Sequence, residues 1–442
     1  MLSREEAKKL AEQVLSYSKY PECELQISAS EDTWVRFANN GLTTSGLVRR
    51  HDIFISSTKD RRTGNTSVNQ LDEKSLRDAV ARSEEMAAIA LPNEEHMPSL
   101  PPQKYLETDR MDAATASVRS PQLIVHARNV IDAARAKSLV AAGFVDRKTS
   151  CSAIAAKTGL FGYHAVADSS LTATVRTPSG DGSGWAAQPS LRFGDIDSGA
   201  VARTAVEKCL ATRGAKRIEP GKYTVVMEPA AAAALLQDFQ FGMNARAADE
   251  GRSFLSKQGG GTYVGEKMFP EIITVRSDPA ASSLPSTPWG GDWLPVQPIA
   301  WIEAGVVKNM HYDRFWAMKQ DRKPSPPPSN IVLEGGKDSL DDLIAATDRG
   351  LLITHFWYIR TLNPKTMQLT GLTRDGLFLI EKGKIAGPVM NLRFNDSPVR
   401  LLQNTKRLGK PMRNTDVEVS DEMLVPALQA TDFTFSSVSD AI

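Results

Sequence analysis

Six histidines are the residues from which a hydrolytic metal site would most readily be built. They are His51, His96, His126, His164, His311 and His355. A catalytic zinc is held by about three protein ligands, and two of these are usually histidines close together on one helix. No two of these histidines are close enough to share a helix, and none is followed by glutamate. Spacing alone therefore indicates no HExxH-type zinc motif.

Other chemical motifs are equally weak. No GxSxG segment is present for a serine nucleophile. The glycines at 182–184 do not open a GxGxxG fingerprint, and those at 259–261 are not followed by GK[ST], so both are predicted to be turns. Asp249-Glu250 could serve as a ligand or a base, although such a pair is more often a solvated helix end. Three cysteines, far apart in the sequence, predict neither a disulfide framework nor a zinc ribbon.

Composition limits the classes of function. The chain has 442 residues with 53 Lys+Arg and 52 Asp+Glu, and its formal net charge is +1. Near-neutral charge makes direct binding to nucleic acid or to an acidic membrane surface an unfavoured reading. No apolar run is long enough to span a membrane, and the N-terminus lacks the apolar region of a secretory signal. A cytoplasmic location is expected.

The first part of the chain has the pattern of an α+β domain. A helix is predicted over residues 3–18, where Ser3 and Glu6 have the spacing of a capping box. Alternating apolar residues predict strands at 24–30, 33–37 and 51–57, and apolar spacing predicts helices at 71–90 and 122–136. Residues 91–121, rich in proline and polar residues, are predicted to be a linker.

Two stretches of this part resemble each other, which predicts an internal duplication. Gly41 and Gly159 occupy the same position in the similar segments 38–42 and 156–160. Gly64 and Gly182 are separated by the same number of residues as Gly41 and Gly159. The strand at 51–57 is matched by residues 169–175, and the helix at 76–87 by residues 201–212. We therefore predict one N-terminal α+β domain over residues 1–215, with repeat units 1–90 and 122–213.

The second part, residues 216–442, is predicted to be a strand-rich domain beginning after a boundary within 211–223. A strand at 221–228 is followed by an alanine-rich helix at 229–240, which Pro229 opens. Further strands are predicted at 271–276, 299–303, 306–312 and 350–360, with a helix at 339–347. A hairpin is predicted over 369–388, with its turn at Glu381-Lys382-Gly383.

The segment from Tyr223 to Phe269 resembles the core of the TldD/PmbA metallopeptidase family, whose older label is modulator of DNA gyrase. The family shows a strand, a Glu-Pro that opens a helix, two leucines, HExxxH in catalytic members, then Ser-Phe and Gly-Glu-Lys. The counterparts here are Glu228-Pro229, Leu235-Leu236, Ser253-Phe254 and Gly265-Glu266-Lys267. Similar segments occur at 40–41, 302–306, 369–371, 379–385 and 423–435, so the resemblance spans nearly the whole chain.

The position of HExxxH carries other residues. Gln237 stands at the first histidine, Asp238 at the glutamate and Gly242 at the second histidine. Glycine offers no side-chain ligand, and a neutral amide is a poor ligand for zinc. The family's third ligand, a late cysteine, has no counterpart because no cysteine follows Cys209. The resemblance thus implies no metal ligand or catalytic residue in this chain, with zinc expected only in a partner subunit.

This pattern resembles the non-catalytic PmbA (TldE) branch, whose chains pair with a TldD-type subunit around a chamber for peptides. The resemblance implies a heterodimer, or else a homodimer, in which this chain is inactive alone. We expect Gln237 and Asp238 to face the cavity, and an extended peptide to bind by strand addition. The apolar run at 351–358 is expected to form the subunit interface or a buried core strand.

Two other functions stay open. One is an active peptidase with unconventional ligands, for which the candidates are Asp238, Asp249, His311 and His355. The other is a regulatory binding module linked to the control of DNA gyrase.

Overall fold

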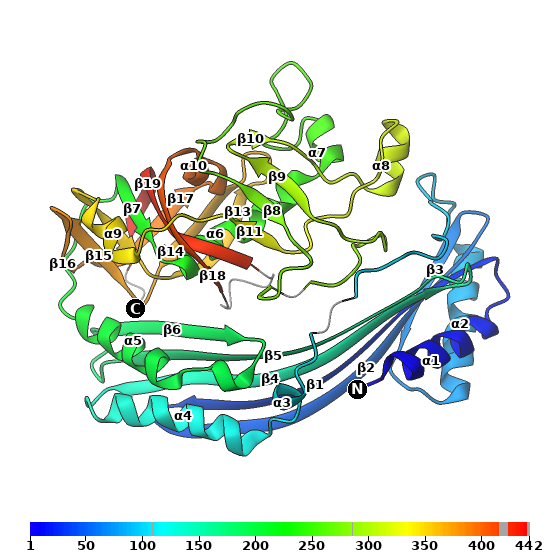
Figure 1. Ribbon diagram of the computed structural model, residues 1–442, viewed down its shortest axis with the longest axis horizontal. Helices are drawn as coiled ribbons and strands as arrows, with labels where there is room; N and C mark the ends of the chain where they lie inside the picture. The colour runs from blue at the N-terminus through cyan, green and yellow to red at the C-terminus, as the bar shows by residue number, and fades with distance from the viewer. Residues whose placement is uncertain (108–109, 285, 415–422, 440–442) are drawn as a thin grey trace.

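The computed structural model describes residues 1–107, 110–284, 286–414 and 423–439. It contains two sheets, and each is built from its own stretch of the chain (Figure 1). The N-terminal sheet has six strands in the order β3-β2-β1-β4-β5-β6, and every neighbouring pair is antiparallel. Its strands are β1 (Glu22–Ala38), β2 (Gly41–Lys59), β3 (Arg62–Val68), β4 (Val140–Ala156), β5 (Phe161–Arg176) and β6 (Ser183–Ser190).

The strands of this sheet are longer than predicted. The strands expected at 24–30 and 33–37 are one strand, β1, and the strand expected at 51–57 is the second half of β2. The polar pair Glu31-Asp32 does not interrupt β1, because the buried guanidinium of Arg147 on β4 pairs with Glu31. A long-range partner thus keeps a polar position inside the sheet.

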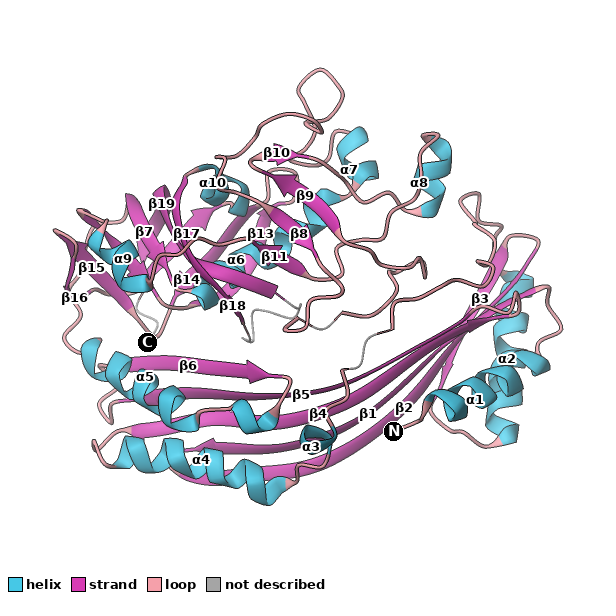
Figure 2. Ribbon diagram, in the orientation of Figure 1, coloured by secondary structure: helices cyan, strands magenta, loops and turns pink. Residues whose placement is uncertain are grey.

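Helices cover one face of the six-stranded sheet, and the C-terminal part lies on the other (Figure 2). The helices are α1 (Arg4–Tyr17), α2 (Glu73–Ile89), α3 (Ala113–Ala116), α4 (Ser120–Arg135), α5 (Ser198–Ala211) and the 3-10 turn η1 (Phe193–Asp195). Helix α1 begins as predicted, since Ser3 and Glu6 form a reciprocal capping box. Two apolar cores lie under these helices: one with α1 and α2, the other with α4 and α5.

The order helix, three strands, helix occurs twice along this part of the chain. One detail of the predicted repeat is wrong. A side chain at Gly64 would collide with the backbone oxygen of Ser83 and the nitrogen of Ala87 on α2. The residue that meets α5 in the same way is Gly184, not Gly182. The two glycines thus let a strand approach its helix closely, and the duplication itself stays a prediction.

The C-terminal part is strand-rich, as predicted, and its thirteen-stranded sheet is mixed. Its strands are β7 (Lys222–Met227), β8 (Val275–Ser277), β9 (Ile299–Glu303), β10 (Val306–Val307), β11 (Ile331–Leu333), β12 (Arg349–Ile353), β13 (Phe356–Asn363), β14 (Gln368–Thr373), β15 (Leu377–Glu381), β16 (Lys384–Pro388), β17 (Leu392–Asp396), β18 (Thr405–Arg413) and β19 (Met423–Val438). Its helices are α6 (Pro229–Leu236), η2 (Gln237–Met243), α7 (Ala245–Asp249), α8 (Arg314–Lys319), α9 (Leu340–Ala345) and α10 (Pro398–Gln403). The chain therefore has a two-domain α+β fold.

Three predictions about this domain need correction. The run at 350–360 is two strands, β12 and β13, which separate at Thr354-His355. The segment 369–388 contains three strands rather than one hairpin, although the turn at Lys382-Gly383 is where it was predicted. The strand expected at 271–276 is only the three residues of β8.

The apolar run at 351–358 is part of the core. Leu351, Ile353 and Phe356 are each 0% exposed and belong to the largest apolar cluster of the C-terminal domain. Of this run, only Tyr358 is exposed among the large apolar side chains. The run therefore cannot supply a subunit interface, and the reading as a buried core strand is correct.

Between the two sheets, the chain is irregular at 212–221 except for an isolated bridge at Lys216, and the boundary at 215/216 stays a prediction. The predicted linker is irregular at 91–107, but its end is helical, in α3 and the first turn of α4. None of the helices within the described residues is long and apolar enough to cross a membrane.

Candidate functional site

The segment predicted to correspond to the family's zinc motif lies at the end of a short buried helix. Helix α6 starts at Pro229, and its residues from Ala231 to Leu236 are all buried. The predicted helix to residue 240 is too long, because at Gln237 the chain tightens into the 3-10 helix η2. Asn244 then caps α7 by accepting a hydrogen bond from the backbone of Ala247 (2.9 Å).

Gly242, at the second histidine position, is enclosed by other side chains. A Cβ atom built there would lie 2.4 Å from the ring of Phe254 and 2.8 Å from the sulfur of Met367. The carbonyl of Gly242 also accepts a hydrogen bond from Ser253 (2.8 Å). A histidine at 242 would therefore have to displace Phe254 and Met367.

Gln237 and Asp238 are half-buried at the start of η2. Their neighbour Phe239 is 2% exposed and packs against Phe254 and Phe269, with ring centroids 5.2 and 6.2 Å apart. This aromatic packing fixes the segment where a metal motif stands in catalytic relatives. That Gln237 and Asp238 face a cavity stays a prediction.

We expect Gly242→His to lower the free energy of unfolding by about 1–3 kcal/mol, the usual cost of overpacking a filled site. Chemical denaturation of the variant measures this cost. Gln237→His is the matched control, and its half-buried position predicts a smaller effect. Equal stabilities for the two variants would contradict the packing described around Gly242.

The residues suggested as unconventional ligands make separate contacts instead. Asp249 accepts a hydrogen bond from the indole of Trp316 (2.7 Å), and His311 Nδ1 lies 2.7 Å from the carbonyl oxygen of Ser325. His355 is paired with a carboxylate elsewhere in the domain. Within the described ranges no three His, Cys, Asp or Glu residues are grouped so that they could hold a metal ion.

His355 belongs to a buried polar cluster that joins the two domains. Its Nδ1 lies 3.2 Å from Oδ2 of Asp375, and the hydroxyl of Ser183 on β6 donates to the other oxygen of that carboxylate. The ring of Trp185, also on β6, stacks on His355 with centroids 4.4 Å apart. Burial is the largest influence on the pKa of Asp375 and acts to raise it, but the hydrogen bonds from His355 and Ser183 and the charges of His355 and Arg374 together outweigh it, so the pKa is lowered. The cluster has the residue types of a Ser-His-Asp catalytic triad but not its order. In such a triad the histidine lies between the serine and the carboxylate, whereas here the carboxylate lies between the serine and the histidine.

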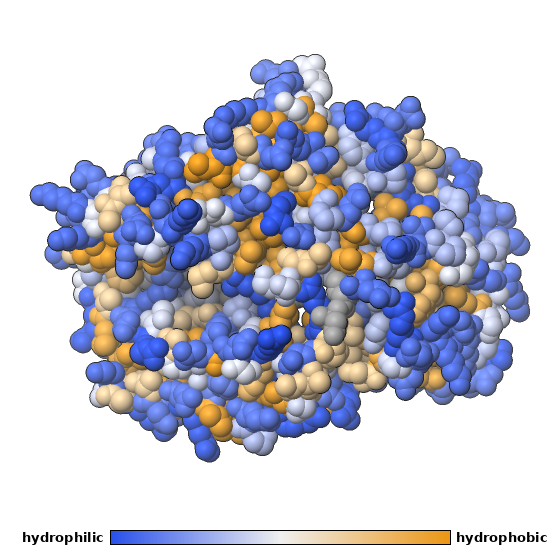
Figure 3. Space-filling model, viewed as in Figure 1, coloured by the Kyte–Doolittle hydropathy of each residue, from blue (hydrophilic) through white to orange (hydrophobic). Residues whose placement is uncertain are grey.

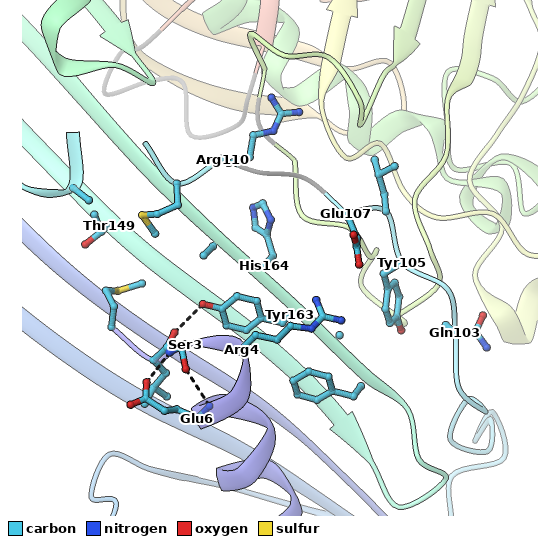
Figure 4. A pocket seen from close by; sticks show the side chains of 18 of the residues that line it. Ser3, Arg4, Glu6, Gln103, Tyr105, Glu107, Arg110, Thr149, Tyr163 and His164 are labelled. Carbon is cyan, nitrogen blue, oxygen red and sulfur yellow. Dashed lines mark hydrogen bonds between the residues drawn. The ribbon is translucent and has the colours of Figure 1, made fainter. Parts of the chain in front are cut away.

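A cleft of about 1160 Å³ lies beside the edge of β5. Figure 4 shows its walls: the N-terminal turn of α1 with Ser3 and Arg4, the β5 residues Tyr163 and His164, and the segment that carries Tyr105 and Arg110. The hydroxyl of Tyr163 donates to the carbonyl oxygen of Leu2 (2.8 Å) and fixes the start of α1. Burial lowers the pKa of His164 to about 4, so its ring is neutral at neutral pH.

The backbone of β5 offers an open edge to this cleft. Strand β6 pairs only with Ser169–Arg176, and ahead of it the amide of Ala167 donates to the carbonyl of Arg110 (2.9 Å). Because alternate residues of a strand point the same way, the N–H and C=O groups of 161, 163 and 165 are directed to the same side as Ala167. On that side the described chain forms an isolated parallel bridge between Arg110 and Val166, and no strand of it pairs with residues 161–164. The site was not predicted from the sequence, because segments far apart along the chain assemble it.

Two family models match the chain. The PmbA/TldA metallopeptidase C-terminal domain matches residues 220–437, and domain 1 of the same family matches residues 23–87. The chain belongs to the PmbA/TldD metallopeptidase family. The family predicted from the sequence is thus confirmed, and the placement of Gln237, Asp238 and Gly242 at its metal motif stays a prediction.

Solved structures of similar fold cover nearly the whole chain. TldE from Thermococcus kodakarensis has a TM-score of 0.86 at 19% identity and covers 97% of this chain and 99% of its own. A protein described as a candidate modulator of a DNA gyrase from Thermotoga maritima MSB8 has a TM-score of 0.84 at 18% identity. The match covers 97% of this chain and 100% of that protein. Another such candidate modulator, from Bacteroides thetaiotaomicron VPI-5482, has a TM-score of 0.84 at 22% identity. The match covers 99% of this chain and 100% of that protein. At these identities the likeness shows the fold alone. No curated protein sequence matches the chain.

Proposed function

We propose that this chain is the non-catalytic subunit of a two-chain zinc peptidase, paired with a homologous TldD-type subunit that carries HExxxH. The observation that carries the proposal is the filled site at Gly242, where Phe254 and Met367 occupy the space that a ligand side chain would need. The family fold around that site is complete, although Gln237 replaces the first histidine. A preserved fold without ligands is what a binding subunit requires.

The role proposed for this subunit is to hold an extended peptide at the β5 edge. The open stretch from Phe161 to Ala165 spans about 16 Å of strand. Backbone hydrogen bonds to such an edge bind peptides without regard to most side chains. A cytoplasmic location goes with this role and stays an expectation from the sequence.

Assembly is tested by assaying peptide cleavage by this chain, by its HExxxH homologue, and by the two together. We expect cleavage to require both subunits. The reading as an enzyme with unconventional ligands predicts cleavage by this chain alone.

Peptide binding at the β5 edge is tested by Ala165→Pro. Proline removes an N–H group that points into the cleft, but leaves the hydrogen bonds to β4 intact. We expect about tenfold weaker binding of a fluorescein-labelled peptide of about ten valine, threonine and serine residues, measured by fluorescence anisotropy. Ala165→Val keeps the N–H group and is the matched control. Unchanged affinity in the proline variant would exclude this edge as the binding site.

A further inference from the structure

A second cleft, of about 430 Å³, lies where β1 and β2 meet the C-terminal domain, and the proposed function makes no use of it. The sheet supplies Glu24 and Phe54, and the opposite wall is the loop with Asp292 and Trp293 and the start of α8. A volume of this size suits a small ligand or one long side chain.

In the part of the chain that the structure describes, the cleft is lined by more acidic than basic side chains. Both carboxylate oxygens of Asp292 are buried and accept no hydrogen bond from the described residues. Glu24 lines the same cleft, and burial raises the pKa of both carboxyls. Asp313 caps α8 by accepting from the amide of Trp316 (2.7 Å). In the described lining, Arg314 is the one cationic side chain, and it donates to the carbonyl of Pro98 (2.6 Å).

Aromatic rings form the other part of the lining. They belong to Phe54, Trp293 and Phe315, and Phe54 is 42% exposed. Trp293 has a φ of +62°, which is rare for a residue with a side chain. Its carbonyl accepts from the hydroxyl of Tyr105 (2.8 Å), and its amide donates to Gly290 (2.9 Å), so the strained turn is held in place.

We propose that this cleft binds an organic cation, a primary ammonium of the kind that a lysine side chain carries, between the carboxylates of Glu24 and Asp292 and the rings of Phe54 and Trp293. Carboxylates and aromatic faces are the two groups that attract an ammonium ion in a partly dry site. A bound cation neutralises the charge that Arg314 alone leaves in excess. The site does not depend on the proposed function, because the β5 cleft shares no lining residue with it.

The experiment uses the full chain and isothermal titration calorimetry with three probes: N-acetyl-lysine methylamide, N-acetyl-norleucine methylamide and cadaverine. Norleucine has the length of lysine without the charge. We expect the lysine probe to bind at least about tenfold more tightly than the norleucine probe. Equal affinity for these two probes would overturn the proposal. Tighter binding of cadaverine than of the lysine probe would indicate a free amine as the ligand, and the reverse order a lysine side chain.

Two variants locate the site. Glu24→Gln and Asp292→Asn should each weaken binding of the lysine probe about tenfold, whereas Asp321→Asn, an exposed acid of another loop, should not. The buried carboxylate of Asp292 accepts no hydrogen bond from the described residues, so replacing it by the neutral amide in Asp292→Asn should not lower the Tm. A loss of binding in this variant would therefore not reflect unfolding. Wild-type affinity in both cleft variants would contradict the assignment.

Discussion

Replacing Arg147 by alanine is expected to lower the free energy of unfolding by about 3–5 kcal/mol, the cost of breaking a buried ion pair. The Arg147 side chain is 0% exposed, and its Nη2 donates to Oε1 of Glu31 (2.9 Å), to Thr33 (3.1 Å) and to the carbonyl of Val118 (3.0 Å). These contacts fill the gap on the helix face between the two apolar cores. Urea denaturation of the purified variant measures the loss.

Arg49→Ala is the matched control, because Arg49 pairs with the same carboxylate (2.8 Å) but has a side chain 65% exposed. An exposed pair contributes about 0–1 kcal/mol, so the control should remain close to the native stability. Equal losses of stability in Arg147→Ala and Arg49→Ala would contradict the claim that the buried ion pair of Arg147 stabilises the sheet more than the exposed pair of Arg49 does.

The same pair predicts how stability depends on pH. Hydrogen bonds from Arg49 and then from Arg147 lower the pKa of Glu31 from 4.5 to about 2. A lowered pKa means that the stabilisation is complete above the ordinary pKa and is lost as the pH falls through the folded one. Stability contributed by Glu31 should therefore decline between pH 4.5 and about 2, and Arg49→Ala and Arg147→Ala should each remove part of that decline.

Replacing Asp375 by alanine is expected to cost about 3 kcal/mol and to loosen the contact between the two domains. The variant leaves the buried His355 and the hydroxyl of Ser183 without their shared acceptor. Limited proteolysis should then cut within residues 212–221 faster than in the native chain. Arg374→Ala, which removes a longer contact to the same carboxylate (3.8 Å), is the control. Unchanged proteolysis in Asp375→Ala would show that this cluster does not hold the domains together.

Local signals predicted the parts of the fold that depend on neighbouring residues. The capping box fixed the start of α1, and the glycine turn at Lys382-Gly383 was placed correctly. Strand lengths were not predictable in this way. Glu31 looked like a break in β1 because its partner, Arg147, lies 116 positions further along the chain.

The candidate sites show the same division. Gln237, Asp238 and Gly242 could be proposed as the motif-equivalent residues because one continuous segment carries them. The packing of Phe254 and Met367 on Gly242 was not predictable, since Met367 comes from a distant hairpin. The β5 cleft was missed for the same reason. A pattern within one segment can indicate that ligand residues are absent from a site, but the side chains that pack there from distant segments are known only from the fold.

The measurement that tests the central claim most directly is peptidase activity after co-expression with the homologous HExxxH chain. The two proteins are purified together by size-exclusion chromatography, and zinc and cleavage of an unstructured peptide are measured in each fraction. We expect one complex, with zinc bound in the partner and activity only when both chains are present. Separate elution at micromolar concentration, with a fully active partner alone, would contradict the claim that this chain is its non-catalytic subunit.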